Sequence, residues 1–285
     1  MKLLPISDLH LERRKLEQIA PLDESFDVLV CAGDIWEGEP ERSVQAIIEL
    51  ARGKPAIIVP GNHDYYTKRF DDHRTMTDFV RILTEEADRQ NAGSRSGDRV
   101  AVLTPADPVY EIGDITFIGL TLWTDWAQAA RWTEPIQGYC NESFEAVARR
   151  EARHWKDGPR EYRAVHTERG PWTPYDMIAE HARQKAILFD KLAPFQPDMT
   201  DKTVVVTHHC PLAHCADVYR DLVTRWWAPA FYCSDLLPKM SEALRPDIWI
   251  FGHIHALFDE THGRTRAVCN PVEGGRFNPA LVIEV

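Results

Sequence analysis

The chain has 285 residues, and its 33 Lys and Arg against 44 Asp and Glu give a formal net charge of −11 at pH 7. Hydrophobic residues make up 44% of the chain and aromatic residues 10%. This composition is enough for a sizeable core, and it excludes wholesale disorder, a collagen-like repeat and a small disulfide-stapled protein. The acidic balance also disfavours binding to DNA or to an anionic membrane, because like charges repel.

The start of the chain predicts where the protein resides. Residues 1–8 reach a polar segment almost at once and leave no room for the apolar stretch of a secretory signal. No run approaches the ~20 apolar residues that a membrane span requires. We therefore expect a cytoplasmic protein without a membrane partner, acting on a small substrate rather than on nucleic acid.

Short apolar runs rich in β-branched residues predict buried strands at 3–7, 28–32, 56–59, 115–120, 204–207, 248–251 and 281–285. Helical patterns lie between them. One begins at Pro40 and is closed by Gly53, another follows Thr173 as its N-cap, and a third is expected from Ser234 to about Leu244. Strands that alternate with helices predict an α/β layered fold.

Two segments interrupt this alternation. Residues of about 125–192 carry many aromatic side chains and no clear strand pattern, which predicts a mostly helical insertion. The segment of about 212–233 is aromatic with weak periodicity and reads as a long connection. Long connections in compact domains are often functional, so we expect this one to line the substrate site.

Five polar clusters follow strand-like runs. They are Asp8-Leu9-His10, Gly33-Asp34, Gly61-Asn62-His63-Asp64, His208-His209 and Gly252-His253-Ile254-His255. In open α/β sheets, ligand sites lie beyond the carboxyl ends of the strands, so the clusters are expected to converge.

The donor groups in these clusters predict a metal site. They offer carboxylate, imidazole and amide ligands without a thiolate, a set that suits Mn, Fe or Zn. The seven candidate ligands are Asp8, His10, Asp34, Asn62, His208, His253 and His255. Seven ligands are too many for one tetrahedral ion but divide between two if Asp34 bridges them, since Gly33 allows close backbone approach. Two adjacent ions activate a bridging water for attack at phosphorus, which predicts hydrolysis.

In their order and their flanking glycines, the five clusters resemble the calcineurin-like metallophosphoesterase superfamily. The resemblance spans Asp8 to His255 and implies a four-layer fold, a β-sandwich core flanked by helices, with residues 1–285 as a single catalytic domain. It implies that one metal is held by Asp8, His10, Asp34 and His255, and the other by Asp34, Asn62, His208 and His253. It further implies that His63, paired with Asp64, orients the phosphate and protonates the leaving alkoxide, because a neutral leaving alcohol needs a proton.

The function expected from this resemblance is phosphoester hydrolysis by a dinuclear metal centre and a bridging hydroxide. A phosphodiesterase acting on a small nucleotide-like or other organic phosphate is the main hypothesis. The alternatives are a nuclease of the same superfamily, a phosphomonoesterase, and a non-catalytic scaffold that retains the fold. His209 is an alternative ligand to His208, and its contribution to the site is left open.

Overall fold

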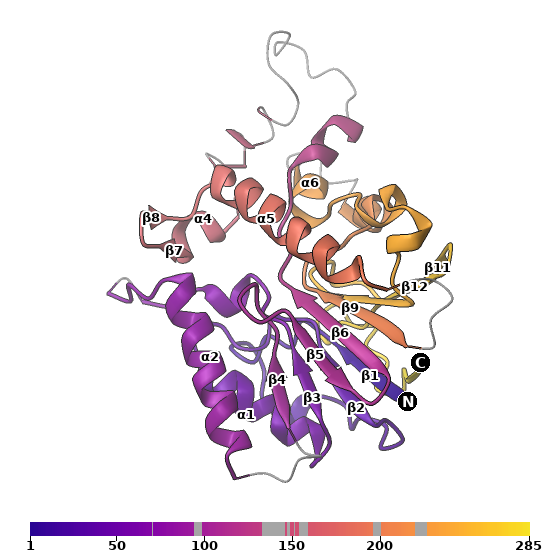
Figure 1. Ribbon diagram of the computed structural model, residues 1–285. Coiled ribbons are helices and arrows are strands. Elements are labelled where there is room, and N and C mark those ends of the chain that lie inside the picture. Colours follow the sequence, from indigo (N-terminus) through magenta and orange to yellow (C-terminus); the bar gives the residue numbers. More distant parts are fainter. Residues whose placement is uncertain are drawn as a thin grey trace.

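The computed structural model describes residues 1–69, 71–93, 99–132, 146, 149–150, 152–153, 159–195, 201–219 and 227–285. Two mixed sheets form its centre (Figure 1). The first contains, in spatial order, β13 (Ile283–Glu284), β1 (Lys2–Ile6), β2 (Val28–Cys31), β3 (Ala56–Ile58) and β4 (Val100–Val102). The second contains β11 (Phe258–His262), β12 (Thr265–Cys269), β10 (Ile248–Phe251), β9 (Lys202–Thr207), β6 (Ile115–Leu120) and β5 (Val109–Ile112).

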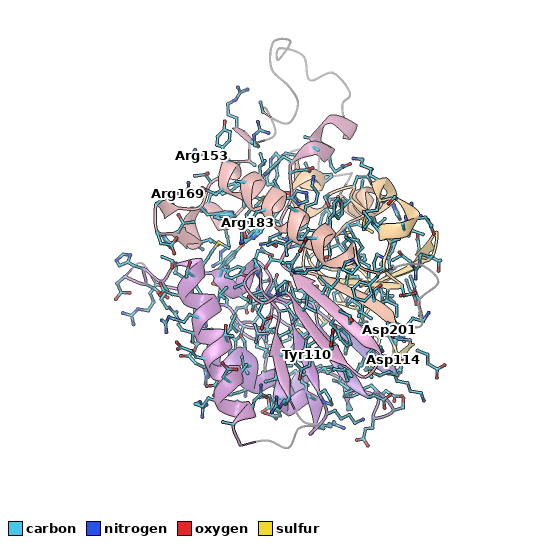
Figure 2. All side chains as sticks on the ribbon, viewed as in Figure 1. Tyr110, Asp114, Arg153, Arg169, Arg183 and Asp201 are labelled. Carbon is cyan, nitrogen blue, oxygen red and sulfur yellow. The ribbon has the colours of Figure 1, made fainter. Side chains whose placement is uncertain are left out.

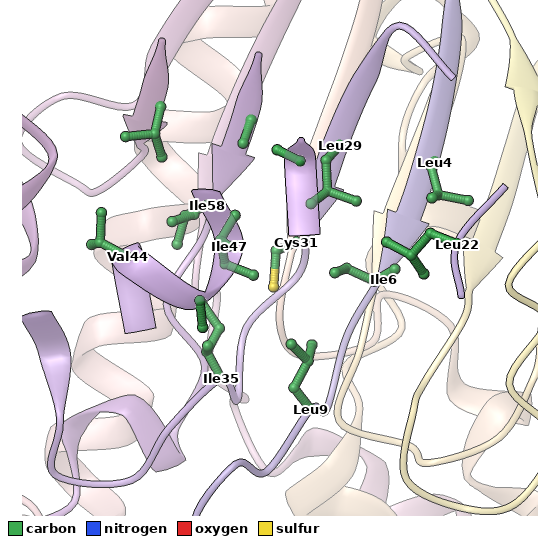
Figure 3. Close-up of a cluster of buried hydrophobic side chains, with 14 of the residues drawn as sticks. Leu4, Ile6, Leu9, Leu22, Leu29, Cys31, Ile35, Val44, Ile47 and Ile58 are labelled. Atoms are coloured by element: carbon green, nitrogen blue, oxygen red, sulfur yellow. The ribbon is translucent and has the colours of Figure 1, made fainter. Parts of the chain in front are cut away.

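Side-chain alternation along the strands separates the inner core from the outer cores. In β2, Val28 and Val30 belong to the cluster that joins the two sheets, whereas Leu29 and Cys31 face the other way. There they meet side chains of α1 (Pro40–Ala51) and α2 (Met76–Asn91), which cover the outer face of the first sheet. Figure 3 shows this outer cluster, with Ile47 of α1 close to Cys31.

The outer face of the second sheet is covered by α5 (Pro174–Leu192), whose Leu188 and Leu192 belong to a cluster with Leu120 and Phe251. The order of layers is therefore helix, sheet, sheet, helix, and the predicted fold class is confirmed. The predicted helix starts are also observed. Pro40 occupies the first turn of α1, and Thr173 forms a capping box with Asp176 at the start of α5.

The carboxyl ends of the central strands meet between the two sheets. β1, β2 and β3 are parallel to one another, as are β6, β9 and β10. Beyond the strand ends, the backbone N–H of Asp8 donates to the carbonyl of Gly33, and that of Gly252 donates to the carbonyl of His208. These bonds join the loops that carry the predicted clusters.

Several features differ from the sequence-based expectation. The helix expected from Ser234 to Leu244 consists of two 3₁₀ helices, η6 (Leu237–Lys239) and η7 (Glu242–Leu244). Pro238 lacks the N–H that an α-helix interior requires, which explains the break. The segment 212–233, expected to be a long connection, contains the 3₁₀ helix η4 (Ala213–Tyr219) and a short helix, α6 (Ala228–Tyr232). Residues 220–226 lie outside the described part.

The predicted insertion is helical only in part. It contains η3 (Ala127–Trp132), α4 (Glu161–Ala164) and α5, but also a small antiparallel hairpin of β7 (His166–Thr167) and β8 (Gly170–Pro171). Residues 133–145, 147–148, 151 and 154–158 of the insertion lie outside the described part. Figure 1 shows α4, β7 and β8 grouped beside the start of α5. Within the described residues, no helix is both long and apolar enough to cross a membrane.

Candidate metal and catalytic site

The seven predicted ligands come together where the strands end. Asp8 follows β1, Asp34 follows β2, and Asn62 follows β3 in the first sheet. From the second sheet, His208 follows β9, and His253 and His255 follow β10. His10 completes the set from the loop after Asp8. All of these side chains except that of His255 are almost completely buried.

Distances between donor atoms define two groups that share Asp34. One consists of Asp8, His10, Asp34 and His255, and the other of Asp34, His208 and His253, each with its ligand atoms within 4.8 Å of one another. Oδ2 of Asp34 lies 3.3 Å from Nε2 of His208 and 3.7 Å from Nε2 of His10. Oδ1 of Asn62 lies 2.8 Å from Nε2 of His208, which places the amide beside the second group.

The backbone at this site adopts an uncommon conformation. The left-handed region is populated by five of the seven candidate ligands, with φ values of 53° at Asp8, 46° at His10, 57° at Asp34, 69° at His253 and 49° at His255. Non-glycine residues adopt positive φ rarely, and such residues concentrate at functional sites. This backbone turns the polar side chains toward one another at the strand ends.

Glycine is required where the loops of β2 and β3 touch. Gly33 has a φ of 87°, and a Cβ there would lie 2.7 Å from Nδ1 of His208 and would overlap the backbone of Gly61. A Cβ on Gly61 would in turn overlap Oδ1 of Asp34. Only glycine therefore allows Asp34 and His208 to approach each other.

Unsatisfied buried atoms in the cluster fit a cation. Oδ2 of Asp34 and Nε2 of His253 are buried and have no hydrogen-bond partner, although buried polar atoms normally have one. Nδ1 of His208 donates to the carbonyl of Ala32 at 2.7 Å, which leaves Nε2 as the atom that faces Asp34. Metal-binding histidines are typically oriented by such a bond. The carboxylate and imidazole donors, with buried atoms that lack hydrogen-bond partners, therefore have the properties of a metal-binding site.

The buried charges of the cluster shift one another's pKa values. Burial alone would raise the pKa of Asp34, but the imidazoles of His208 and His63 hold it well below its usual value. Burial alone would lower the pKa of His208, whereas the charges of Asp34 and Asp8 raise it to about 9. A cation bound between Asp34 and His208 would therefore compete with protonation of the His208 imidazole.

His63 is paired differently from the expectation. Its Nδ1 lies 3.5 Å from Oε2 of Glu37, and its ring stacks on Tyr66 at a centroid distance of 4.3 Å. Asp64, the expected partner, accepts backbone N–H bonds from Gly61, Asp34, Ile35 and Trp36. The Asp64 carboxylate holds the loops after β2 and β3 together, and Glu37 takes the place beside the imidazole.

Burial, first of all, and the Asp34 charge raise the pKa of Asp64 to about 6. Glu37 behaves in the opposite way. Burial would raise its pKa, but contacts with His63 and Arg160 lower it to about 2. Glu37 could have been found from the sequence, because an acidic residue three positions after the candidate ligand Asp34 is a candidate for the same site. Nothing in the sequence around Arg160 indicates that this residue reaches the site.

The insertion contributes a buried carboxylate to the site. Nδ2 of Asn62 donates to Oε1 of Glu161 at 2.5 Å, and the hydroxyl of Tyr66 donates to the same oxygen. These bonds fix the amide so that its oxygen faces His208. Burial raises the pKa of Glu161. Sequence reasoning missed this residue because nothing in the primary structure links position 161 to position 62.

A pocket of about 310 Å³ opens onto the cluster. Its polar lining includes His63, His253, His255 and Arg160. Aromatic residues of the 212–233 connection also line it, namely Trp227, Phe231 and Tyr232. A larger pocket, of about 460 Å³, lies between α2, the β7–β8 hairpin and α5 and contains none of the candidate site residues.

His209 lies behind the cluster rather than within it. Its backbone N–H donates to the carbonyl of Thr121 at 3.0 Å, and its ring packs 5.2 Å from that of Trp123 and 4.2 Å from that of His253. Burial, together with the His208 charge, lowers the pKa of His209 well below its usual value. A neutral imidazole at this position supports the ring of His253.

Comparisons with known proteins show the family and the fold of the chain. The model of the family described as calcineurin-like phosphoesterase matches residues 1–257. A phosphopantetheinyl hydrolase from Mycobacterium tuberculosis has a similar structure, with a TM-score of 0.66 and 20% identity, over 96% of this chain and 90% of that one. A putative 5′-nucleotidase from Staphylococcus aureus matches with a TM-score of 0.45 and 14% identity, over 95% of this chain and 49% of that one. The comparison with curated proteins gives no match.

The likeness to the phosphopantetheinyl hydrolase shows the fold, and the family match covers most of the chain, including every candidate ligand. The chain therefore belongs to the calcineurin-like phosphoesterase family and is a hydrolase of phosphoric ester bonds.

Proposed function

We propose that the protein is a dinuclear-metal phosphodiesterase that acts on a small organic phosphate, such as a nucleotide-like diester. The observation that carries this proposal is the sharing of one carboxylate, that of Asp34, by two groups of ligand atoms. We propose that residues 1–285 form one catalytic domain, in which the insertion of about 125–192 and the connection of about 212–233 shape the substrate pocket.

The seven side chains divide between two ions in this proposal. Asp8, His10, Asp34 and His255 would hold one ion, and Asp34, Asn62, His208 and His253 the other. Imidazole, amide and carboxylate donors accept Mn, Fe or Zn. When bound, a metal pair supplies Lewis acidity at the phosphoryl oxygens and a water-derived nucleophile.

A side chain of the protein, that of His63, is placed to protonate the leaving group directly. Nδ1 of His63 faces Glu37, so Nε2 is the atom available to give a proton to the departing alkoxide in the pocket. The ring of Tyr66 stacks on the imidazole, and the backbone N–H of His63 donates to Oδ1 of Asp34 at 2.8 Å. These two contacts fix the imidazole in place. Such a positioned acid matters most for substrates with a poor leaving group.

The charges around the pocket favour a diester over a monoester. The two arginines of its lining are both paired, Arg160 with Glu37 at 2.7 Å and Arg13 with Glu273 at 2.7 Å. A dianionic monoester gains most from unpaired positive charge, whereas a diester carries a single negative charge. The apolar wall around Phe231 offers a surface for the second ester substituent.

The nuclease alternative requires a basic surface. Arg153, Arg169 and Arg183 are exposed on the layer formed by the insertion (Figure 2), but none of them lines the pocket that contains His63. Arg169 pairs with Asp176 at 2.6 Å, and Arg183 pairs with Glu180 at 2.5 Å. Paired arginines attract phosphate backbones weakly, which supports the small substrate.

The test is turnover by protein that has been stripped with a chelator and reloaded separately with Mn, Fe or Zn. We expect metal-dependent hydrolysis of bis-p-nitrophenyl phosphate, of cyclic nucleotides or of a phosphopantetheinyl diester to exceed that of p-nitrophenyl phosphate and single-stranded DNA. Elemental analysis gives the metal content of each preparation. Faster hydrolysis of DNA would favour the nuclease, and faster hydrolysis of the monoester would favour the phosphomonoesterase. Full metal content without turnover of any substrate would favour the non-catalytic scaffold.

A further inference from the structure

A third group of metal-ligating side chains lies outside the site described above. It consists of His214 in η4 and of Glu260 and His262 in β11, whose ligand atoms all lie within 4.8 Å of one another. We propose that these three residues bind a divalent transition-metal ion, with Zn²⁺ the best fit, and that the ion ties the 212–233 connection to the edge of the second sheet.

Two of the three distances between the donor atoms match the edges of a zinc coordination polyhedron. Nε2 of His214 lies 3.4 Å from Oε2 of Glu260, and Nε2 of His262 lies 3.5 Å from the same oxygen. Tetrahedral zinc with bonds of about 2.0–2.2 Å places neighbouring ligand atoms roughly 3.3–3.6 Å apart. The side chains therefore need little rearrangement to take up an ion.

The local fold explains why the three groups converge. Glu260 and His262 are two residues apart in β11, so their side chains leave the same face of the strand. Phe258 lies on that face as well, and its ring packs 5.6 Å from the ring of His214 and 6.4 Å from that of His262. These ring contacts hold both imidazoles beside the carboxylate of Glu260.

The donor atoms also have the chemistry of a transition-metal site. Nε2 of His262 is buried and has no hydrogen-bond partner, so its bonding capacity is unused. Two imidazoles and one carboxylate suit Zn²⁺, whereas Ca²⁺ and Mg²⁺ require oxygen donors. The carboxylate is half-exposed, which leaves a path for the ion and room for a water molecule as fourth ligand.

An ion at this site would act on the substrate pocket through η4. This helix ends at Tyr219, whose hydroxyl donates to the carbonyl of Ile254 at 2.9 Å, between two candidate ligands of the main site. The ring of Tyr219 also stacks on Tyr232, a residue of the pocket wall, at 4.0 Å. Fixing His214 to β11 would thus fix the start of the connection that forms this wall.

Zinc binding by the intact protein tests the proposal. In equilibrium dialysis with elemental analysis, we expect the wild type to hold one more zinc ion per chain than Glu260→Gln or His214→Ala. Loss of one ligand should weaken zinc binding by more than the roughly 10–100-fold that loss of a supporting partner costs. Asp259→Asn is the matched control. Its carboxylate points to the opposite face and pairs with Arg266 at 2.8 Å, so this variant should hold as much zinc as the wild type.

A second readout locates the ion. Diethyl pyrocarbonate modification, mapped by mass spectrometry, should show zinc protecting His214 and His262 at the same concentration while the exposed His73 continues to react. The same protection is expected in Asp34→Asn, which disables the main site. Equal zinc content in the wild type and Glu260→Gln, together with unchanged reactivity of both histidines, would overturn the proposal and leave a hydrogen-bonded surface cluster.

Discussion

Arg160 donates two N–H bonds to the carboxylate of Glu37, at 2.9 and 2.7 Å, and the same carboxylate lies 3.5 Å from Nδ1 of His63. Arg160 belongs to the predicted insertion and Glu37 to the loop after β2. The insertion therefore helps to position the imidazole proposed as the acid, in addition to shaping the pocket.

Removing the charge of Glu37 tests this positioning. Glu37→Gln is expected to lower kcat for an alkyl diester, by less than the roughly 10²–10⁴-fold expected for loss of the acid itself. The reason is that the ring of His63 loses the carboxylate that lies 3.5 Å from its Nδ1. Hydrolysis of bis-p-nitrophenyl phosphate, whose leaving group needs no proton, should change much less, so the comparison of the two substrates is the measurement. An equal loss on both substrates would argue against a role through His63.

His63→Ala addresses the acid directly. We expect kcat for a substrate with a poor leaving group to fall by about 10²–10⁴-fold, with the metal content unchanged, because His63 is outside both ligand sets of the proposal. His73→Ala, which removes an exposed imidazole, serves as the control. Unchanged turnover in His63→Ala would exclude the acid role.

Asp34→Asn should remove metal from both proposed positions at once. Losing the shared carboxylate leaves three ligands in each set and deletes the charge that both cations face. Metal content by elemental analysis and turnover should both fall to background. Metal in 100-fold excess over its dissociation constant adds about 2.7 kcal/mol to the stability of a protein with one site, so the wild type should melt higher with metal than with chelator. A variant that keeps a full metal complement would contradict the bridging role.

Glu161→Gln tests the support that the insertion gives to Asn62. The amide of glutamine would meet the amide of Asn62 and the hydroxyl of Tyr66 with fewer acceptor sites, so Asn62 loses its fixed orientation. Metal affinity should drop by about 10–100-fold, as for other residues that orient ligands. Glu168→Gln changes an exposed carboxylate of the same insertion and should bind metal like the wild type. Equal affinities in the two variants would remove Glu161 from the site.

The pKa of Glu37 predicts a pH-dependent stability difference. This pKa is about 2 in the folded protein against 4.5 for an unperturbed glutamate, so folding favours the ionised form. The stabilisation is present above pH 4.5 and is lost as the pH falls toward 2. Urea unfolding of metal-free wild type and Glu37→Gln should show a gap in unfolding free energy at pH 6 that narrows below pH 4.5. A gap that stays constant across this range would contradict the assigned pKa.

The strands and the layer order could be predicted from the sequence because the core imposes its pattern locally. Runs such as 28–32 and 248–251 are buried on both faces, and this gives continuous apolar segments. Proline at position 40 and threonine at position 173 likewise determine their helix starts through their own backbone and side-chain chemistry. β11 and β12 were missed because their hairpin lies at a sheet edge, and β11 is polar and partly exposed.

The convergence of the candidate ligands could be predicted because each lies in the loop that follows a central strand, so that sheet topology alone brings them together. The partners of those ligands could not. Glu161 and Arg160 reach the site only through the tertiary path of the insertion, and the pairing of His63 with Glu37 rather than Asp64 depends on loop geometry. The single helix expected at 234–244 was wrong because Pro238 interrupts the segment, and a capping residue such as Ser234 does not determine how far a helix continues.

The left-handed backbone at Asp8, His10, Asp34, His253 and His255 restricts which amino acids these positions can accept in evolution or in a mutational scan. Glycine and asparagine fit this conformation, whereas valine, isoleucine and threonine would strain the chain as well as remove a donor. These positions should therefore tolerate only a few residue types, which are small or carry a planar polar side chain, even in homologues that have lost catalytic activity.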